Sequence, residues 1–255
     1  MASVRFVAIG DSFTEGVGDE LPDGVVRGWA DLTAAGWADS LGEPIQYANL
    51  AIRGKLVWPI VEQQLEPALA LKPTHLSFNG GGNDMLRPRT SISHIADAFS
   101  QVLRRCDEEG VQLILLSGAN PAQQLPMRGM IQRRGDLLSD AVEESFVGRD
   151  DVIRAFNWPD RELSTPGYWS EDRLHMNSRG HHRVAARVLG AIGHDPDPGW
   201  WSMPPLPASG PRGWQYYREH VGPWMVRRIR RTSSGDGLEP KYGTWRRMEP
   251  GGAGE

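Results

Sequence analysis

Cysteine is almost absent from this chain of 255 residues, which contains only Cys106. A single cysteine cannot form an intramolecular disulfide, and it cannot build a metal site made of several thiolates. Cys106 follows Ile95, Phe99 and Val102 at helical spacing. We therefore expect a buried thiol that packs as a small apolar side chain and not as a reactive group.

Long apolar runs are missing as well. No segment approaches the roughly 20 consecutive apolar residues that a transmembrane helix needs. The N-terminal Met-Ala-Ser leads directly into a strand pattern, without the basic region, apolar region and cleavage site of a secretory signal. We expect no transmembrane segment and a cytoplasmic protein.

Positive charge is scarce in most of the chain and concentrated near its C-terminus. Residues 1–211 contain 19 Lys and Arg against 27 Asp and Glu, whereas residues 212–247 contain nine against three. An acidic body disfavours nucleic-acid binding, so no nucleic-acid partner is expected. The basic segment 212–247 either pairs with the acidic body or contacts an anionic partner.

Apolar runs that alternate with amphipathic stretches predict an α/β protein. Strands are predicted at 4–9, 45–51, 74–78, 111–116 and 151–156, and helices at 29–41, 56–71, 91–109, 127–147 and 178–192. Pro67 lies inside the 56–71 pattern and is expected to kink or break that helix. Five strands alternating with helices predict a doubly wound, five-stranded parallel sheet.

The composition changes after residue 193. Proline recurs at 196, 198, 204, 205 and 207, and five of the ten tryptophans lie beyond residue 199. Because disordered segments are poor in aromatic residues, part of this region is expected to pack. We predict an α/β domain over residues 1–193 and an irregular Pro/Trp/Arg-rich extension over 194–255.

A glycine-flanked turn follows the first predicted strand: Gly10-Asp11-Ser12-Phe13-Thr14-Glu15-Gly16. The two glycines permit a tight backbone, which places the Ser12 hydroxyl beyond the carboxyl edge of the sheet, where open α/β sheets bind ligands. A serine in that place can be a nucleophile if a base takes its proton and donors stabilise the resulting oxyanion. Its alternative role is that of a helix N-cap.

A late loop supplies a base. Asp172 and His175, three residues apart, can approach Ser12 together. A neutral imidazole takes the hydroxyl proton while a carboxylate fixes its tautomer. These residue types predict a serine hydrolase.

Metal and nucleotide sites are less well supported. His181 and His182 lie on the last predicted helix without convincing metal-ligand spacing, and they are expected at the surface. Gly80-Gly81-Gly82 lacks both the Walker ending and a complete dinucleotide fingerprint. We therefore predict neither a metal nor an organic cofactor.

Four short blocks, in order, resemble those of the SGNH hydrolases, also called the GDSL esterase/lipase family. They are Gly10-Asp11-Ser12, Asn49 to Gly54, Gly81-Gly82-Asn83-Asp84 and Asp172-Arg173-Leu174-His175. The resemblance covers about residues 4–192. It implies a flavodoxin-like three-layer α/β/α sandwich and hydrolysis of carboxylic esters through an acyl-serine intermediate.

The resemblance also implies a role for each matched residue. Ser12 is expected to be the nucleophile, His175 the general base and then acid, and Asp172 the group that orients the imidazole. The oxyanion hole is expected to comprise the backbone N–H groups of Ser12 and Gly54 and the side-chain amide of Asn83.

Some residues near these blocks have open or structural roles. Asp11 is expected to brace the turn, and Asp84 to be structural. Arg53, where many members of the family have a small residue, either pairs with an acidic neighbour or binds an anionic group of the substrate.

The expected activity is hydrolysis of a small or acylated ester. If the site excludes water and admits an alcohol, the same residues would transfer the acyl group instead. A third hypothesis is a catalytically silent binding module recruited through the basic tail. The family acts on acetylated sugars, lysophospholipids, thioesters and aryl esters, and loops 17–27, 120–130 and 157–171 are expected to choose among them.

Overall fold

The computed structural model describes residues 3–87, 89–204, 206–207, 213–216, 218–219, 222 and 233–251. The strands are β1 (Arg5–Ile9), β2 (Ile45–Asn49), β3 (His75–Phe78), β4 (Gln112–Leu116), β5 (Ile153–Ala155) and β6 (Tyr242–Met248). The helices are α1 (Ser12–Glu15), α2 (Trp29–Leu41), α3 (Val57–Ile60), the π-helical η1 (Val61–Leu65), α4 (Glu66–Ala70), α5 (Gly82–Met85), α6 (Ile92–Glu109), α7 (Arg128–Ser145), the 3₁₀-helical η2 (Pro166–Tyr168), α8 (Ser178–Ala191), α9 (Pro198–Ser202) and α10 (Trp214–Tyr216).

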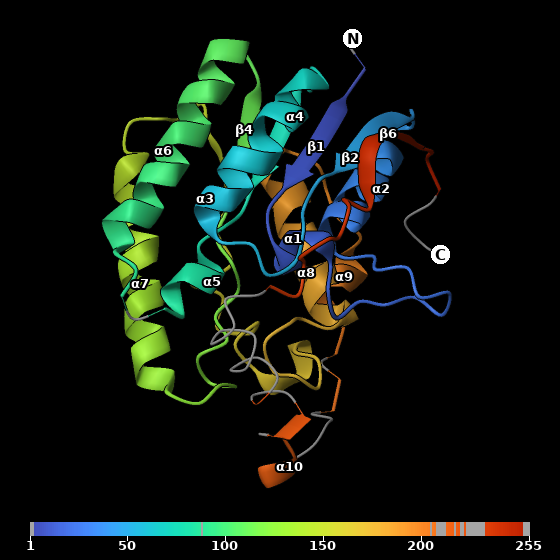
Figure 1. Ribbon diagram of the computed structural model, residues 1–255. Helices are drawn as coiled ribbons and strands as arrows, with labels where there is room; N and C mark the ends of the chain where they lie inside the picture. Colours follow the sequence, from blue (N-terminus) through green and yellow to red (C-terminus); the bar gives the residue numbers. More distant parts are fainter. Residues whose placement is uncertain are drawn as a thin grey trace.

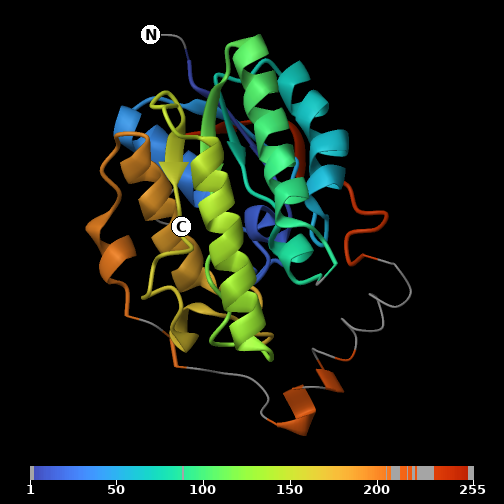
Figure 2. The same ribbon diagram turned by 90° about the vertical axis from the view of Figure 1, so that its left-hand side faces the viewer.

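A central sheet with the strand order β5-β4-β3-β1-β2-β6 separates two helical layers (Figure 1). Helices α3, α4, α6 and α7 cover one face, and Figure 2 shows α6 and α7 in front of the sheet. Helices α2, α8 and α9 cover the other face. The expected three-layer α/β/α sandwich is therefore confirmed.

Alternation along the strands creates the two cores. On β1, Phe6 and Ala8 point to the α2/α8 face, whereas Val7 and Ile9 point to the α6 face. All four side chains are completely buried. Burial on both faces explains why the internal strands appear in the sequence as nearly continuous apolar runs.

Over the described residues the sheet has six strands and not the predicted five, because the C-terminal extension returns to it. Strand β6 pairs antiparallel with β2, with Tyr47 opposite Arg246, whereas β1 to β5 are mutually parallel. Three of the seven β6 residues are half-buried and four are exposed, as suits an edge strand. Its Arg-rich sequence has no apolar alternation that would have predicted a strand.

The predicted 56–71 helix is not broken at Pro67. Instead α3, η1 and α4 follow one another without a gap, and the π-helical turn lies directly before Pro67. Proline has no amide proton and cannot donate a helical hydrogen bond. A π-helical turn shifts the hydrogen-bond ladder, and this shift accommodates the missing bond.

The chain reverses its winding at β1, which lies between β2 and β3. Ligands of doubly wound sheets bind at such a switch point, beyond the carboxyl ends of the strands. Here the segments that follow the carboxyl ends of β1 and β3 are α1, which begins at Ser12, and α5, which contains Asn83.

The fold bears on the single cysteine and on the expected absence of a transmembrane segment. Cys106, on α6, is completely buried in the core, and burial raises the pKa of its thiol to about 12, so it is an inert apolar side chain. Within the described ranges, no helix has both the length and the apolar character of a membrane span.

Candidate active site

The turn after β1 is held by Asp11 and closed by glycine. Asp11 is the N-cap of α1, and its Oδ1 accepts a hydrogen bond from the Phe13 N–H at 3.1 Å. The helix ends at Gly16, which has a φ of 103°. A Cβ at Gly16 would lie 1.7 Å from the carbonyl oxygen of Arg27, so only glycine fits here.

Ser12, His175 and Asp172 form a continuous hydrogen-bonded chain. His175 Nε2 lies 3.0 Å from Ser12 Oγ, and His175 Nδ1 lies 2.5 Å from Asp172 Oδ2. In this arrangement the imidazole can accept the serine proton, and the carboxylate can fix the tautomer that leaves Nε2 free to do so. The three residues come from α1 and from the loop before α8, 160 positions or more apart in the sequence.

Local hydrogen bonds fix the carboxylate. Asp172 Oδ1 accepts from the backbone N–H groups of Leu174 and His175, at 2.9 and 3.0 Å, and from the Ser170 hydroxyl at 2.8 Å. Burial alone would raise the pKa of Asp172, but the hydrogen bond and charge of His175 and the two backbone donors hold that pKa well below its usual range. Asp172 is therefore ionised at every pH at which the protein would work.

The three predicted oxyanion donors do not all line the same cavity. Ser12 and Asn83 both line one cavity, and Gly54 is absent from the lining among the described residues. The Asn83 amide donates to the Lys55 carbonyl at 3.0 Å and to Asp11 Oδ2 at 3.2 Å. Gly54, with a φ of 74°, packs against the tail: a Cβ there would lie 2.3 Å from Ser233 Oγ.

Arg53 pairs with an acidic neighbour, the first of its two expected roles. Glu15 Oε2 accepts from the Arg53 backbone N–H at 2.6 Å, and Glu15 Oε1 accepts from the Arg53 Nε at 2.8 Å. The pair joins the end of α1 to the turn that contains Gly54. Asp84 is structural, as expected, because its Oδ2 accepts from the Val57 N–H at the start of α3, at 2.9 Å.

The expectation of surface positions for His181 and His182 was wrong. His181 is completely buried and His182 is 8% exposed, because both point from α8 toward the core. The backbone N–H of Trp29 donates to His181 Nδ1 at 3.2 Å, so the ring proton is on Nε2, which faces the Val17 carbonyl at 3.3 Å. Burial lowers the pKa of His181 to about 4 and keeps it neutral. Across the described residues no group of three or more His, Cys, Asp or Glu side chains could hold a metal ion.

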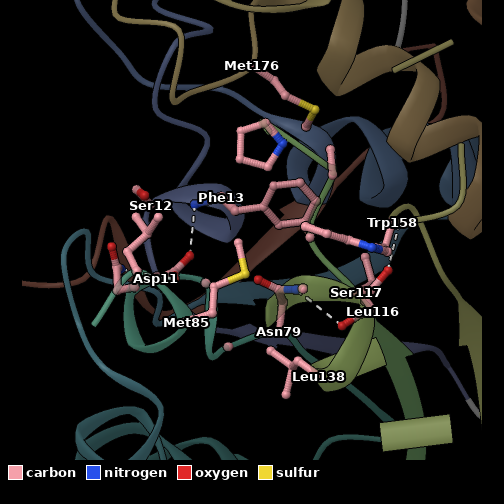
Figure 3. A pocket seen from close by; sticks show the side chains of 18 of the residues that line it. Asp11, Ser12, Phe13, Asn79, Met85, Leu116, Ser117, Leu138, Trp158 and Met176 are labelled. Atoms are coloured by element: carbon pink, nitrogen blue, oxygen red, sulfur yellow. Dashed lines mark hydrogen bonds between the residues drawn. The ribbon is translucent and has the colours of Figure 1, made fainter. Parts of the chain in front are cut away.

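A small apolar cavity of about 120 Å³ opens beside Ser12 (Figure 3). Its wall includes Met85, Leu116, Leu138 and Trp158. All three loops expected to choose the substrate contribute, through residues such as Val17, Pro121, Trp158 and Trp169. Helix α7 contributes as much, through Gly135, Leu138, Ser139 and Val142, none of which belongs to a motif visible in the sequence.

Two tail residues also contact the site loops, and no sequence motif pointed to them. The Tyr216 hydroxyl donates to the Asp172 carbonyl at 3.1 Å, and its ring lies 4.2 Å from the Arg173 guanidinium. Lys241 reaches the end of α1, where its ammonium donates to the Glu15 carbonyl at 2.6 Å.

Solved structures with this fold are numerous but distant in sequence. A lipase from a goat-rumen metagenome shares 19% identity, with a TM-score of 0.62 over 76% of this chain and 99% of the lipase. A variant of an acetyl xylan esterase from Geobacillus stearothermophilus shares 20% identity, with a TM-score of 0.59 over 76% of this chain and 98% of that one. An α/β hydrolase from the metagenome of Lake Arreo, Spain, shares 23%, with a TM-score of 0.58 over 76% and 97%. At these identities the likeness establishes the fold.

A comparison with curated proteins finds no match. The sequence profile of the GDSL-like lipase/acylhydrolase family matches residues 8–183, which is more than two thirds of the chain and contains every predicted site residue. This match supports an enzyme that hydrolyses ester bonds. The chain therefore belongs to the GDSL-like lipase/acylhydrolase family.

Proposed function

We propose that this protein is a serine esterase that hydrolyses carboxylic esters through an acyl-Ser12 intermediate. One observation carries the proposal: the unbroken chain from Ser12 Oγ to His175 Nε2, at 3.0 Å, and from His175 Nδ1 to Asp172, at 2.5 Å. A serine without such a base is a weak nucleophile, and His175 supplies the base in this arrangement.

In the first half-reaction Ser12 Oγ attacks the ester carbonyl carbon while its proton passes to His175 Nε2. The tetrahedral intermediate collapses, the C–O bond to the alcohol breaks, and His175 returns the proton to the departing alcohol. In the second half-reaction His175 takes a proton from water, which attacks the acyl-Ser12 carbonyl. Collapse of that intermediate breaks the acyl bond to Ser12 Oγ, His175 returns its proton to that oxygen, and the carboxylic acid is released.

The oxyanion is proposed to bind three donors: the backbone N–H groups of Ser12 and Gly54 and the Asn83 amide. The shared cavity of Ser12 and Asn83 supports two of these donors. The two N–H groups of the Asn83 amide donate to Lys55 and Asp11 in the free protein, so one of these hydrogen bonds is exchanged for the oxyanion during the reaction. The contact between Arg53 and Glu15 supports the third indirectly, because it fixes the backbone directly before Gly54.

The cavity restricts the acyl group. An apolar cavity of about 150 Å³ is known to take a benzene molecule. The cavity beside Ser12, at about 120 Å³, is slightly smaller and lined mainly by apolar side chains. We therefore propose an unbranched acyl chain of about four to six carbons, or a single aromatic ring, as the preferred acyl group.

Hydrolysis is favoured over acyl transfer by the exposure of the base. The side chains of His175 and Asp172 are 22% and 29% exposed, so water reaches the group that would activate it. A silent binding module would have no need for the intact hydrogen-bonded chain. Much of the basic segment 212–247 lies outside the described residues, and its anionic partner stays a prediction.

The test is covalent labelling by a fluorophosphonate, followed by intact mass measurement. The wild type is expected to gain one adduct, and Ser12→Ala none. Ser40→Ala is the matched control, because Ser40 also contacts a histidine, with its Oγ 2.8 Å from His194 Nδ1, and should label like the wild type. Turnover of short-chain esters by the wild type must fall with Ser12→Ala. A folded wild type that neither labels nor turns over any ester contradicts the proposal.

A further inference from the structure

Lys241, from the C-terminal extension, has its charge buried among backbone carbonyls. Its side chain is 14% exposed and that of Asp31, its partner at 2.6 Å, is 11% exposed. The ammonium also donates to three carbonyl oxygens, those of Glu15 at 2.6 Å, Arg27 at 2.8 Å and Val26 at 3.0 Å. Removing one partner from such a buried pair is strongly destabilising, so Lys241 is anchored where it lies.

The chemistry of this position requires lysine. The chain has 25 arginines and only three lysines, yet a lysine lies here. An ammonium is a compact charge whose three donors radiate from one atom, whereas a guanidinium is a flat fork. Four acceptors lie within 3.0 Å of this one nitrogen, so at least one of its three N–H groups is shared between two acceptors. The flat fork of a guanidinium does not point its donors at acceptors that converge on one atom.

The ammonium lies at the end of the helix that begins with Ser12. Glu15 is the last residue of α1, and its carbonyl has no partner within so short a helix. The segment that contains Gly28 returns to the end of α1 and lies very close to Gly16, since a Cβ at Gly28 would lie 2.3 Å from the Gly16 Cα. Lys241 therefore ties the end of α1 to the returning segment and to the first turn of α2.

The same residue, Glu15, extends the contact to the other side of the site. Its carboxylate holds both the backbone N–H and the side chain of Arg53. The extension also touches this turn directly, because a Cβ at Gly235 would lie 2.1 Å from the Arg53 carbonyl oxygen. Gly54, the next residue, is the proposed oxyanion donor.

We propose that Lys241 is a positioning residue of the active site. By fixing the end of α1 it holds Ser12 and, through Glu15, the Arg53–Gly54 turn in the geometry that the reaction needs. The C-terminal extension is then part of the catalytic unit and not an appendage. This inference rests on the proposed esterase activity.

The test compares Lys241→Met with Lys72→Met in the full-length protein. Methionine keeps most of the length of the side chain and removes the charge. Lys72 is exposed in the turn that leads into β3, at the opposite end of the sheet, so its variant should match the wild type. Lys241→Met is expected to lower kcat, counted per phosphonate-titrated site, about 10- to 100-fold with KM within about twofold, because misplacement of about 1 Å costs that much. A merely structural lysine would lower the thermal midpoint but not kcat per titrated site.

A double variant tests the route through Glu15. Glu15→Gln should lower kcat in the same direction, and Lys241→Met with Glu15→Gln should lose less than the product of the two single losses, because both changes loosen one connected set of contacts. Losses that multiply fully would overturn the route through Glu15.

Gly235→Ala keeps the inference testable if Lys241→Met does not fold. Its Cβ would push on the Arg53 carbonyl, so kcat should fall about tenfold or more. Gly243→Ala, whose Cβ would meet no atom closer than 4.0 Å, is the control.

The outcomes separate the two proposals. A wild type that is labelled and active, together with a Lys241→Met protein whose kcat stays within twofold, overturns the positioning role alone. If Lys241→Met does not fold, a Gly235→Ala protein with unchanged kcat overturns it instead. A wild type that neither labels nor hydrolyses any ester overturns the esterase proposal and this inference together.

Discussion

Asp11 and Asn83, 72 positions apart in the sequence, are joined by a hydrogen bond from Asn83 Nδ2 to Asp11 Oδ2 at 3.2 Å. The other oxygen of Asp11 caps the helix that begins with Ser12. One carboxylate therefore connects the segment after β1 to the segment after β3, across the switch point of the sheet. This brace relates the nucleophile to its proposed oxyanion donor.

The Asp11 brace should make stability depend on pH. Burial raises the pKa of Asp11 from 3.8 to about 6. Because the folded state holds this proton more tightly than the unfolded state, the stabilising contribution is complete below about pH 4 and is lost as the pH rises through about 6. The change is about 3 kcal/mol in the free energy of unfolding.

Asp11→Asn removes this titration. The free energy of unfolding of the variant, minus that of the wild type, should rise by about 2 kcal/mol between pH 4 and pH 7, whatever its constant offset. Urea unfolding at several pH values measures the difference. A difference that stays flat over this range would show that Asp11 does not titrate as its burial implies.

Asp172 should affect the rate of the reaction more than substrate binding. In Asp172→Asn the imidazole loses the partner that fixes its tautomer, so kcat should fall on the order of 10³- to 10⁴-fold with little change in KM. Steady-state kinetics on a chromogenic ester measure both constants. Asp195→Asn, an exposed change outside the site loop, is the control, and an equal loss in both proteins would argue against the proposed role.

Asn83 should contribute chiefly in the transition state. Asn83→Ala is expected to lower kcat by a factor of about 10² to 10³, which corresponds to about 3 to 4 kcal/mol, because one oxyanion donor is lost. The phosphonate should still label Ser12, though more slowly. A kcat within threefold of the wild type would remove Asn83 from the proposed oxyanion hole.

The sequence predicted the parallel core of the fold and the meeting of Ser12 with His175 because both rest on local signals. Buried parallel strands are apolar runs, and glycine-rich turns after them mark one edge of the sheet. The positions of Asp172 and His175 in one loop followed from their spacing alone. Each of these inferences needs only a few neighbouring residues.

The sequence did not predict the residues whose roles depend on contacts with distant parts of the chain. Lys241 is one basic residue in a basic segment, and only the pairing of β6 with β2 brings it to the end of α1. His181 belongs to a polar pair on an amphipathic helix, yet its buried ring accepts a hydrogen bond from the backbone N–H of Trp29. Gly235 has no sequence signal at all, since its closeness to Arg53 arises from packing of the extension.

The cavity wall offers a test of acyl-chain preference at Leu138. This side chain comes from α7 and lines the cavity together with Met85 and Leu116 (Figure 3). Leu138→Ala removes three carbon atoms from the wall, so the chain length of highest kcat/KM should increase by about two carbons. Leu138→Trp should instead fill the cavity and restrict turnover to acetyl esters.

Leu137→Ala is the matched control, because Leu137 is the neighbouring leucine on the same helix and is 47% exposed. A p-nitrophenyl ester series from two to ten carbons measures the profile. If Leu138→Ala and Leu138→Trp both keep the wild-type profile, the acyl group does not enter this cavity, and the chain-length proposal is wrong while the role of Ser12 stands.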